Sequence, residues 1–375
     1  MSTTNVKEHV LLNIKNLPGK SIRRKIVVLE CDDWGSIRMP SKEVYDFLMR
    51  SGIPVGQNRF SKYDSLADKE DLENLFENLL EVRDAYGRPA VMTPVVNVAN
   101  PDFKKIRESG FRNYFYEPFT ETILRYGRGQ ETFDTWKKGI ESGIFVPEFH
   151  GREHIAVHFW LKRLAKGDQN LRTAFDQEVV SIDIKDIHPA LSGFRPEFYF
   201  DSGSQIAFLK SSISEGTELF REIFGYTPRA FVPGNNIFHP VFEETVAKAS
   251  IKYLYISHFN SIPDGAGNLR IKYYPVGKKA LSGLRYYTRN CAFEPTDPAY
   301  HGFDLTLKQI EAAFRWGKPA NISTHRVNFI GAIEKANREK GLRELSLLLK
   351  TIVRKWPDVE FMSSESMFKV LYNND

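Results

Sequence analysis

Short apolar runs recur along the chain and alternate with segments in which apolar residues return every three or four positions. The short runs are rich in Val, Ile, Leu and Phe and are bounded by turn residues, which is typical of strands covered on both faces. We predict seven such strands, at residues 26–31, 90–98, 144–149, 229–233, 253–257, 320–324 and 359–362.

The segments between these strands have the 3.6-residue periodicity of amphipathic helices. Residues 68–86 form the clearest case, because Leu72, Leu75, Phe76 and Leu79 recur at helical spacing. Further helices are predicted at residues 41–48, 155–164, 214–224, 242–250, 305–316 and 341–355. Strands that alternate with helices indicate a parallel sheet covered by helices, so the predicted fold class is α/β.

One domain with an N-terminal extension is the organisation that we predict. A short helix near residues 6–16 ends before Pro18-Gly19. Residues 1–24 are therefore expected to form an N-terminal helical extension, and residues 25–375 a single domain. Insertions are expected at residues 101–143, 181–203 and 260–301, the last with an extra hairpin between residues 272–276 and 284–293.

Polar residues stand where the predicted strands end. In (β/α) barrels the active site is built at the carboxyl ends of the strands, so this distribution favours a barrel with one site. An open doubly wound sheet is the alternative. The polar residues at these ends are Asp32, Asp33, Asn97, His150, Asn235, His258 and His325.

Two adjacent carboxylates, Asp32 and Asp33, stop the first apolar run. Neighbouring side chains of a strand point to opposite faces, so both can reach one cavity only where the strand ends and the backbone turns. Trp34-Gly35 supplies such a turn. Two like charges this close repel unless a cation or a partner separates their roles, and we take this as an indication of a metal ion. The alternative is that Asp32 caps the next helix and Asp33 is solvated.

His150 and His154 are four residues apart, which on a helix places both imidazoles on one face. Two histidines and one carboxylate are a common ligand set of hydrolytic zinc sites, which leave a fourth position for water. Asp33 would complete such a set. The alternative is that two surface histidines share this interval by chance.

Composition narrows the function classes. The formal net charge is only +5 and the basic residues are scattered, so nucleic-acid binding is not predicted. The two cysteines, Cys31 and Cys291, exclude a disulfide framework. No apolar run approaches the roughly 20 residues of a membrane span, and residues 1–20 lack the core of a signal peptide. We therefore expect a cytoplasmic protein.

The ordered motifs resemble those of polysaccharide deacetylases, the carbohydrate esterase group that includes chitin and peptidoglycan deacetylases. Their first motif is a strand that ends in Asp-Asp with Gly shortly after, and their second is His-x-x-x-His. Their last is an apolar strand that ends in a catalytic His. In this chain the similar segments are residues 29–35, 150–154, 220–234 (leading into the third motif) and 322–325, and the resemblance runs from about residue 25 to 365.

The resemblance implies a distorted (β/α) barrel of about seven strands and metal-dependent removal of an acetyl group from an N-acetylated sugar. Asp33, His150 and His154 would hold the metal, with zinc as the expected ion. Asp32 would act as base and His325 as acid. A divalent ion activates water and polarises the carbonyl, a carboxylate can take the water proton, and a cationic imidazole can protonate the departing amine.

Two residues of the family pattern have no clear equivalent in this chain. The family has an Arg before the Pro of its third motif, directed at the base, whereas this chain has Val232. Candidates to replace that Arg are Arg195, Arg229, Arg152 and Arg38. The family also has an acidic residue that orients the catalytic His, for which only Asp264 and Asp304 are candidates here.

Three residues are predicted to contact substrate. Trp34 either stacks on a sugar ring or walls the pocket, and Asn235 either caps a helix or contacts sugar hydroxyls. Arg195 is the third. Because no secretion signal is expected, a lipid-linked or nucleotide-linked precursor of a surface polysaccharide is the expected carbohydrate substrate.

Two other functions remain open at this point. A glycoside hydrolase would use paired carboxylates without a metal, for example Asp32 with Glu148 or Glu294. A non-catalytic carbohydrate-binding relative would keep the barrel and lack the base-directing Arg.

Overall fold

The computed structural model describes residues 12–184, 188, 191 and 193–372. Within these residues a nine-stranded sheet forms the centre of the molecule, and all its neighbouring strands are parallel. The strand order is β10-β7-β6-β5-β2-β1-β12-β11, with β13 paired to the start of β1. The strands are β1 (Lys25–Trp34), β2 (Met92–Asn97), β5 (Glu148–Gly151), β6 (Ala230–Phe231), β7 (Tyr253–Tyr255), β10 (Arg285–Tyr287), β11 (Cys291–Ala292), β12 (Ala320–His325) and β13 (Val359–Phe361).

The sheet curls so that its two edge strands approach each other. β10 and β11 lie at opposite ends of the strand order, yet only Thr288, Arg289 and Asn290 connect them. Four Cα–Cα steps span at most roughly 14 Å, which limits the gap between the edges. The predicted distorted (β/α) barrel is therefore confirmed. All seven predicted strands are present, and β10 and β11 add to them.

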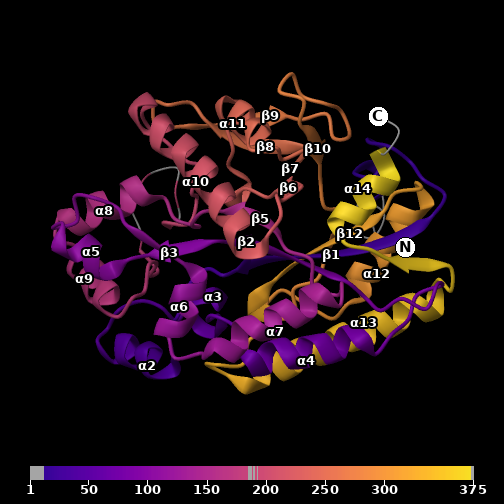
Figure 1. Cartoon of the computed structure of the whole chain (residues 1–375), viewed down its shortest axis with the longest axis horizontal. Helices are drawn as coiled ribbons and strands as arrows, with labels where there is room; N and C mark the ends of the chain where they lie inside the picture. Colours follow the sequence, from indigo (N-terminus) through magenta and orange to yellow (C-terminus); the bar gives the residue numbers. More distant parts are fainter. Residues whose placement is uncertain (1–11, 185–187, 189–190, 192, 373–375) are drawn as a thin grey trace, which may run out of the picture.

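Helices cover the outside of the sheet (Figure 1), and α4, α7 and α13 lie side by side along one flank. Asp68 starts α4 with a capping box, because its side chain accepts from Asp71 N while the Asp71 side chain accepts from Asp68 N. None of the described helices combines the length and apolar composition needed to cross a membrane. The helices are α2 (Lys42–Arg50), α3 (Arg59–Tyr63), α4 (Lys69–Leu80), α5 (Phe103–Glu108), α6 (Phe119–Arg125), α7 (Gln130–Glu141), α8 (Val157–Ala165), α9 (Gln169–Asp176), α10 (Ile206–Phe224), α11 (Glu243–Lys248), α12 (Asp304–Arg315), α13 (Lys335–Lys355) and α14 (Ser364–Tyr372).

Two small two-stranded antiparallel sheets stand apart from the barrel sheet. One joins β3 (Ala99–Pro101) to β4 (Tyr116–Pro118), and the other joins β8 (Phe259–Pro263) to β9 (Leu269–Tyr273). The hairpin predicted between residues 272–276 and 284–293 is wrong. Residues 285–287 and 291–292 instead enter the barrel as β10 and β11, because a short strand pattern does not identify its partner strand.

The N-terminal extension is only partly described. Residues 1–11 lie outside the described residues, so the predicted helix at residues 6–16 is not tested over most of its length. Residues 12–14 are helical. Asn16 is buried, and its Oδ1 accepts a hydrogen bond of 2.8 Å from Asn290 Nδ2, which ties this segment to the connection between β10 and β11.

Candidate active site

The carboxyl end of β1 breaks the normal alternation of a strand. Its pairing with β2 shifts register between Cys31 and Trp34, and Asp33 has a φ of 72°, in the left-handed region. Because of this irregularity, Asp32 and Asp33 both line one cavity. The turn that the sequence required is thus made at Asp33 itself, and Gly35 follows with a φ of 77°.

The cavity has a volume of about 300 Å³. Asp32, Asp33, His150, His154 and His325 all line it. They come from the carboxyl end of β1, from β5 and the turn after it, and from the last residue of β12. The predicted single site at the carboxyl ends of the strands is therefore present as a cavity.

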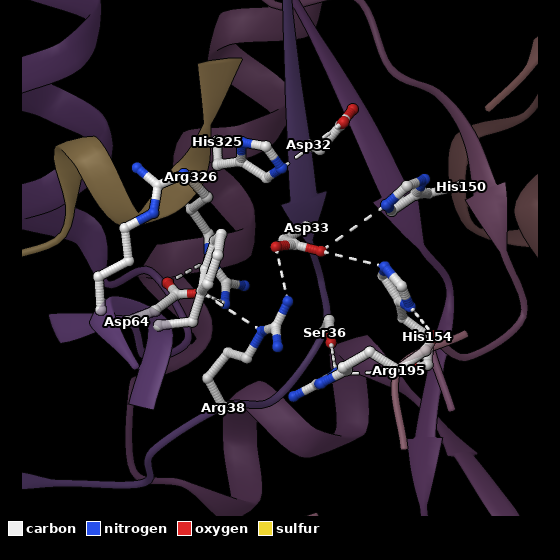
Figure 2. Close-up of polar contacts among 12 residues, drawn as sticks. Asp32, Asp33, Ser36, Arg38, Asp64, His150, His154, Arg195, His325 and Arg326 are labelled. Carbon is white, nitrogen blue, oxygen red and sulfur yellow. Dashed lines mark hydrogen bonds and ion pairs between the residues drawn. The ribbon is translucent and has the colours of Figure 1, made fainter. Parts of the chain in front are cut away.

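Asp33, His150 and His154 converge within this cavity (Figure 2). Asp33 Oδ1 lies 3.7 Å from His150 Nε2 and 3.8 Å from His154 Nε2. One ligand atom from each residue can be chosen so that all three lie within 4.8 Å of one another. Ligands at tetrahedral positions ~2.1 Å from zinc would be about 3.4 Å apart. The three side chains thus fit a common metal ion with only small adjustments.

Backbone carbonyls orient both imidazoles. His150 Nδ1 donates to Val232 O at 2.6 Å, and His154 Nδ1 donates to Arg195 O at 2.6 Å. A carbonyl oxygen only accepts, so the proton is on Nδ1 and the lone pair of Nε2 is directed toward Asp33. Burial lowers the pKa of His154 well below its usual value, which keeps it in the neutral form that binds metals.

The two histidines are not on a helix, as their spacing suggested. His150 is in β5, and the chain turns at Gly151, with a φ of 121°, before α8 begins at Val157. The rings pack at a centroid distance of 5.0 Å. A strand end followed by a turn brings the imidazoles together as well as one helical turn would.

Asp33 is held on its other side by Arg38. Arg38 Nη2 donates to Asp33 Oδ2 at 2.8 Å, leaving Oδ1 toward the two histidines. Burial would raise the pKa of Asp33, but the charge of Arg38 outweighs burial and holds that pKa well below its usual range. The carboxylate is therefore ionised and available as a ligand.

Asp32 is held by Arg289, a residue that no sequence motif indicated. Arg289 Nη1 donates to Asp32 Oδ2 at 2.6 Å and Nη2 donates to Oδ1 at 2.7 Å, while Nε donates to Glu30 Oε2 at 2.5 Å. Burial would raise the pKa of Asp32, but the charge and hydrogen bonds of Arg289 lower it overall. Arg289 therefore makes a bidentate contact with Asp32, whereas Val232 stands at the position where the resemblance leads us to expect such an Arg.

The four arginines expected to direct Asp32 have other partners. Arg38 contacts Asp33, Arg152 Nε donates to Glu153, and Arg229 lies 3.4 Å from Glu365. Arg195 donates to Ser36 Oγ, to His154 O and to Ile37 O. That prediction was wrong, because the arginine that reaches Asp32 is Arg289, from the connection between β10 and β11.

Glu294 orients His325. His325 Nδ1 lies 2.6 Å from Glu294 Oε1, and His325 Nε2 lies 3.9 Å from Asp32 Oδ2. Burial lowers the pKa of His325, but Glu294 and the two aspartates outweigh it and raise that pKa to about 9. Neither Asp264 nor Asp304, the candidates from sequence, lines the cavity; Asp264 accepts hydrogen bonds within the β8–β9 turn instead.

Of the three residues predicted to bind substrate, Asn235 and Arg195 line the cavity and Trp34 does not. Asn235 is exposed at the rim with a φ of 58°. Arg195 is fastened by its hydrogen bonds to Ile37 and Ser36. Trp34 has no exposed surface and packs edge-on against Trp136 and Phe145 in the core, so the stacking role is corrected. The irregularity at Asp33 turns the next side chain inward.

Two further strand-end residues, Asn97 and His258, do not line this cavity, although both were among the polar residues expected there. Glu148, a possible partner of Asp32 in a glycosidase, also lies elsewhere. Its Oε2 accepts from the backbone N–H groups of Arg229 and Ala230, both at 2.8 Å. Glu294, the other possible partner, bonds His325 and does not line the cavity.

Arg289 and Glu294 follow β10 and β11, so the strand-end rule that selected the other polar residues applies to them too. Residues 284–293 were predicted to belong to a hairpin, so the strand-end rule was not applied to Arg289 and Glu294. Once residues 285–287 and 291–292 are recognised as barrel strands, both residues become candidates from position alone.

No protein-family model and no curated protein matches the sequence. Among solved structures, 4-alpha-glucanotransferase from Thermococcus litoralis is 10% identical with a TM-score of 0.46, and the match covers 92% of this chain and 40% of that one. A protein of Parabacteroides distasonis described as a glycoside hydrolase/deacetylase is 9% identical with a TM-score of 0.47, covering 95% and 73%. A family 4 acetyl xylan esterase from Clostridium thermocellum, in complex with a cobalt ion, is 12% identical with a TM-score of 0.35, covering 92% and 91%.

The chain thus spans about 40% of the length of the glucanotransferase. The three proteins are named for different reactions.

Proposed function

We propose that this protein is a metal-dependent hydrolase that removes N-acetyl groups from a sugar or a polysaccharide precursor. The observation that carries the proposal is the convergence of Asp33, His150 and His154 on one cavity that also contains Asp32 and His325. A three-ligand set with a separate carboxylate and a separate cationic histidine provides the metal site, the base and the acid with which an amide can be hydrolysed.

Asp33 Oδ1 and the Nε2 atoms of His150 and His154 would hold the metal ion. The bound ion, with zinc as the proposed identity, supplies an activated water and polarises the substrate carbonyl. Asp32 is ionised and oriented by Arg289, so its carboxylate can accept the proton of the attacking water.

His325 supplies the acid. Its Nδ1 is engaged by Glu294, so the proton available to substrate is the one on Nε2, the atom on the side of Asp32. With a pKa raised to about 9, the imidazole is cationic at neutral pH and can protonate the departing nitrogen. An amine leaves only when protonated, whereas an alcohol needs this help less, which supports an N-acetyl rather than an O-acetyl substrate.

The carbohydrate part of the proposal rests on the ordered motifs that resemble polysaccharide deacetylases. Arg289 also supplies the base-directing contact whose absence motivated a non-catalytic role. A cytoplasmic location and a lipid-linked or nucleotide-linked precursor as substrate are further parts of the proposal.

The test combines metal content with acetate release. Purified protein is loaded with zinc, analysed for bound metal and incubated with N-acetylated oligosaccharides. Asp33→Ala and His150→Ala are expected to lose bound zinc and activity together. Asp32→Asn and His325→Ala are expected to keep zinc and to lose activity by roughly 100- to 10,000-fold, the contribution of a general acid or base.

Two results would contradict the proposal. Retention of zinc by both ligand variants would show that the metal binds elsewhere. Activity that survives a strong chelator and yields new reducing ends, without acetate, would indicate a glycoside hydrolase.

A further inference from the structure

Four charged side chains of alternating sign form a buried chain beside the candidate active site (Figure 2). Asp33 lies at one end and Arg326, which follows His325, lies at the other; Arg38 and Asp64 lie between them. We propose that Asp64 is a positioning residue that orients Arg38 and, through it, the metal-binding carboxylate of Asp33. This inference rests on the proposed function, because it takes Asp33 as a metal ligand.

Asp64 and Arg326 form a two-point contact in the interior. Arg326 Nε donates to Asp64 Oδ1 at 3.0 Å and Nη2 donates to Oδ2 at 2.9 Å. Neither side chain has any exposed surface. Two parallel hydrogen bonds between planar groups fix the plane of the carboxylate as well as its position. The same contact anchors the turn that begins directly after His325.

Arg38 is held from two sides by α3 and the residue that caps it. Asp64 is the C-cap of α3, and its Oδ2 lies 3.7 Å from Arg38 Nε. Phe60, inside α3, places its ring centroid 4.8 Å from Arg38 Cζ. The Arg38 guanidinium therefore has little freedom when Nη2 donates to Asp33 Oδ2 at 2.8 Å. That contact leaves Asp33 Oδ1 for the histidines.

The charges of these side chains predict the same effect as their orientation: removal of the Asp64 charge weakens metal binding. The Asp64 carboxylate offsets part of the positive charge that Arg38 brings next to the cation site, where Arg195 also lines the cavity. Without the Asp64 charge, Arg38 would pair more strongly with Asp33 and would repel a bound cation. Both changes weaken metal binding. Loss of a partner that hydrogen-bonds a metal ligand costs roughly 10- to 100-fold in metal affinity, and Asp64 supports such a partner, Arg38.

The experiment measures metal affinity directly, so it needs no substrate. Full-length protein is stripped of metal and titrated with zinc by calorimetry, and its cobalt absorption spectrum is recorded as a report on ligand geometry. Asp64→Asn is expected to bind zinc roughly 10- to 100-fold more weakly than the unchanged protein and to shift the cobalt spectrum.

Asp71→Asn is the matched control. Asp71 is also buried, with 1% of its side chain exposed, and its Oδ1 accepts from Arg338 Nη1 at 2.8 Å, but it does not line the cavity. It is expected to lower thermal stability as Asp64→Asn does, while zinc affinity changes by less than about twofold because the site is separate.

Arg326→Lys covers the case in which Asp64→Asn does not fold. It keeps the positive charge and removes the two-point contact, so a smaller loss of zinc affinity, about three- to tenfold, is expected. Unchanged zinc affinity in the folded variants of Asp64 and Arg326 would overturn the inference, as would an equal loss in Asp71→Asn. Failure of the unchanged protein to bind zinc would overturn the proposed function itself.

Discussion

The imidazole of His325 lies between two carboxylates that it contacts through different nitrogens. Glu294 Oε1 is 2.6 Å from Nδ1, and Asp32 Oδ2 is 3.9 Å from Nε2. Glu294 is itself fixed, because its Oε2 accepts from Arg59 Nη1 at 2.9 Å and from Asn328 Nδ2 at 3.0 Å. Glu294 therefore fixes the orientation of the His325 ring and helps to raise its proton affinity.

Glu294→Gln is expected to move the basic limb of the pH–activity profile to lower pH. The Glu294 charge and hydrogen bond help to raise the pKa of His325 to about 9, so their removal lowers that pKa and the acid loses its proton at a lower pH. The measurement is kcat/KM against pH at constant zinc occupancy.

Asp264→Asn provides the comparison for this prediction. Asp264 accepts hydrogen bonds from Ala266 and Asn268 within the β8–β9 turn and does not contact His325. Its profile should match that of the unchanged protein. An unaltered basic limb in Glu294→Gln would show that Glu294 does not control the acid.

At the scale of elements, the end of β1 determines how the site is assembled. Asp33 and Gly35 both have positive φ values, of 72° and 77°. A Cβ atom built on Gly35 would lie 2.2 Å from the backbone oxygen of Asn97 and 3.2 Å from Phe119 Cγ. The backbone of β2 thus passes too close for any side chain at this position.

Gly35→Ala is expected to lower the free energy of unfolding by about 3 kcal/mol or more, because left-handed strain and a backbone clash add together. Gly52→Ala isolates the strain alone: Gly52 has a φ of 71°, and no atom lies within 4 Å of the position that a Cβ would occupy. A loss of only about 1 kcal/mol is expected there. Urea unfolding of both variants checks the difference, and equal losses would contradict the close approach of β2.

At the scale of the whole molecule, the near-closure of the barrel creates the contact on Asp32. Arg289 belongs to the three-residue connection that crosses from edge strand β10 to edge strand β11. From there it reaches Glu30 and Asp32 on β1. A fully closed barrel would fill this gap with strand pairing, so the distortion of the barrel is what admits the guanidinium.

Arg289→Gln is expected to reduce activity about 100-fold, the cost of misplacing a catalytic group by roughly 1 Å. Zinc content should remain unchanged, because the Arg289 guanidinium donates to Asp32 and Glu30 and holds none of the three proposed metal ligands. The measurements are acetate release and bound metal on the same preparation.

Arg229→Gln is the control for Arg289, since Arg229 is half-exposed beside Glu365 and does not line the cavity. It should retain full activity. Full activity in Arg289→Gln would mean that Asp32 needs no guanidinium to act as base.

Local patterns along the sequence determined the seven core strands, most of the long helices and the strand-end positions of Asp32, Asp33, His150 and His325. These features depend on residues that are close in the chain: strand and helix periodicity act over a few positions, and the strand-end rule needs only the order of elements. The expected convergence of His150 and Asp33 followed from the same rule, whereas His154 was expected there from a helical spacing and reaches the site through the turn at Gly151 instead.

Tertiary structure alone decided which groups hold those side chains. Arg289 and Asp32 are 257 residues apart, and their contact depends on how far the sheet curls. The inward direction of Trp34 depends on a register shift against β2. Neither feature has a local signal, because periodicity specifies the face of a side chain only while the strand is regular, and long-range partners are set by the path of the whole backbone.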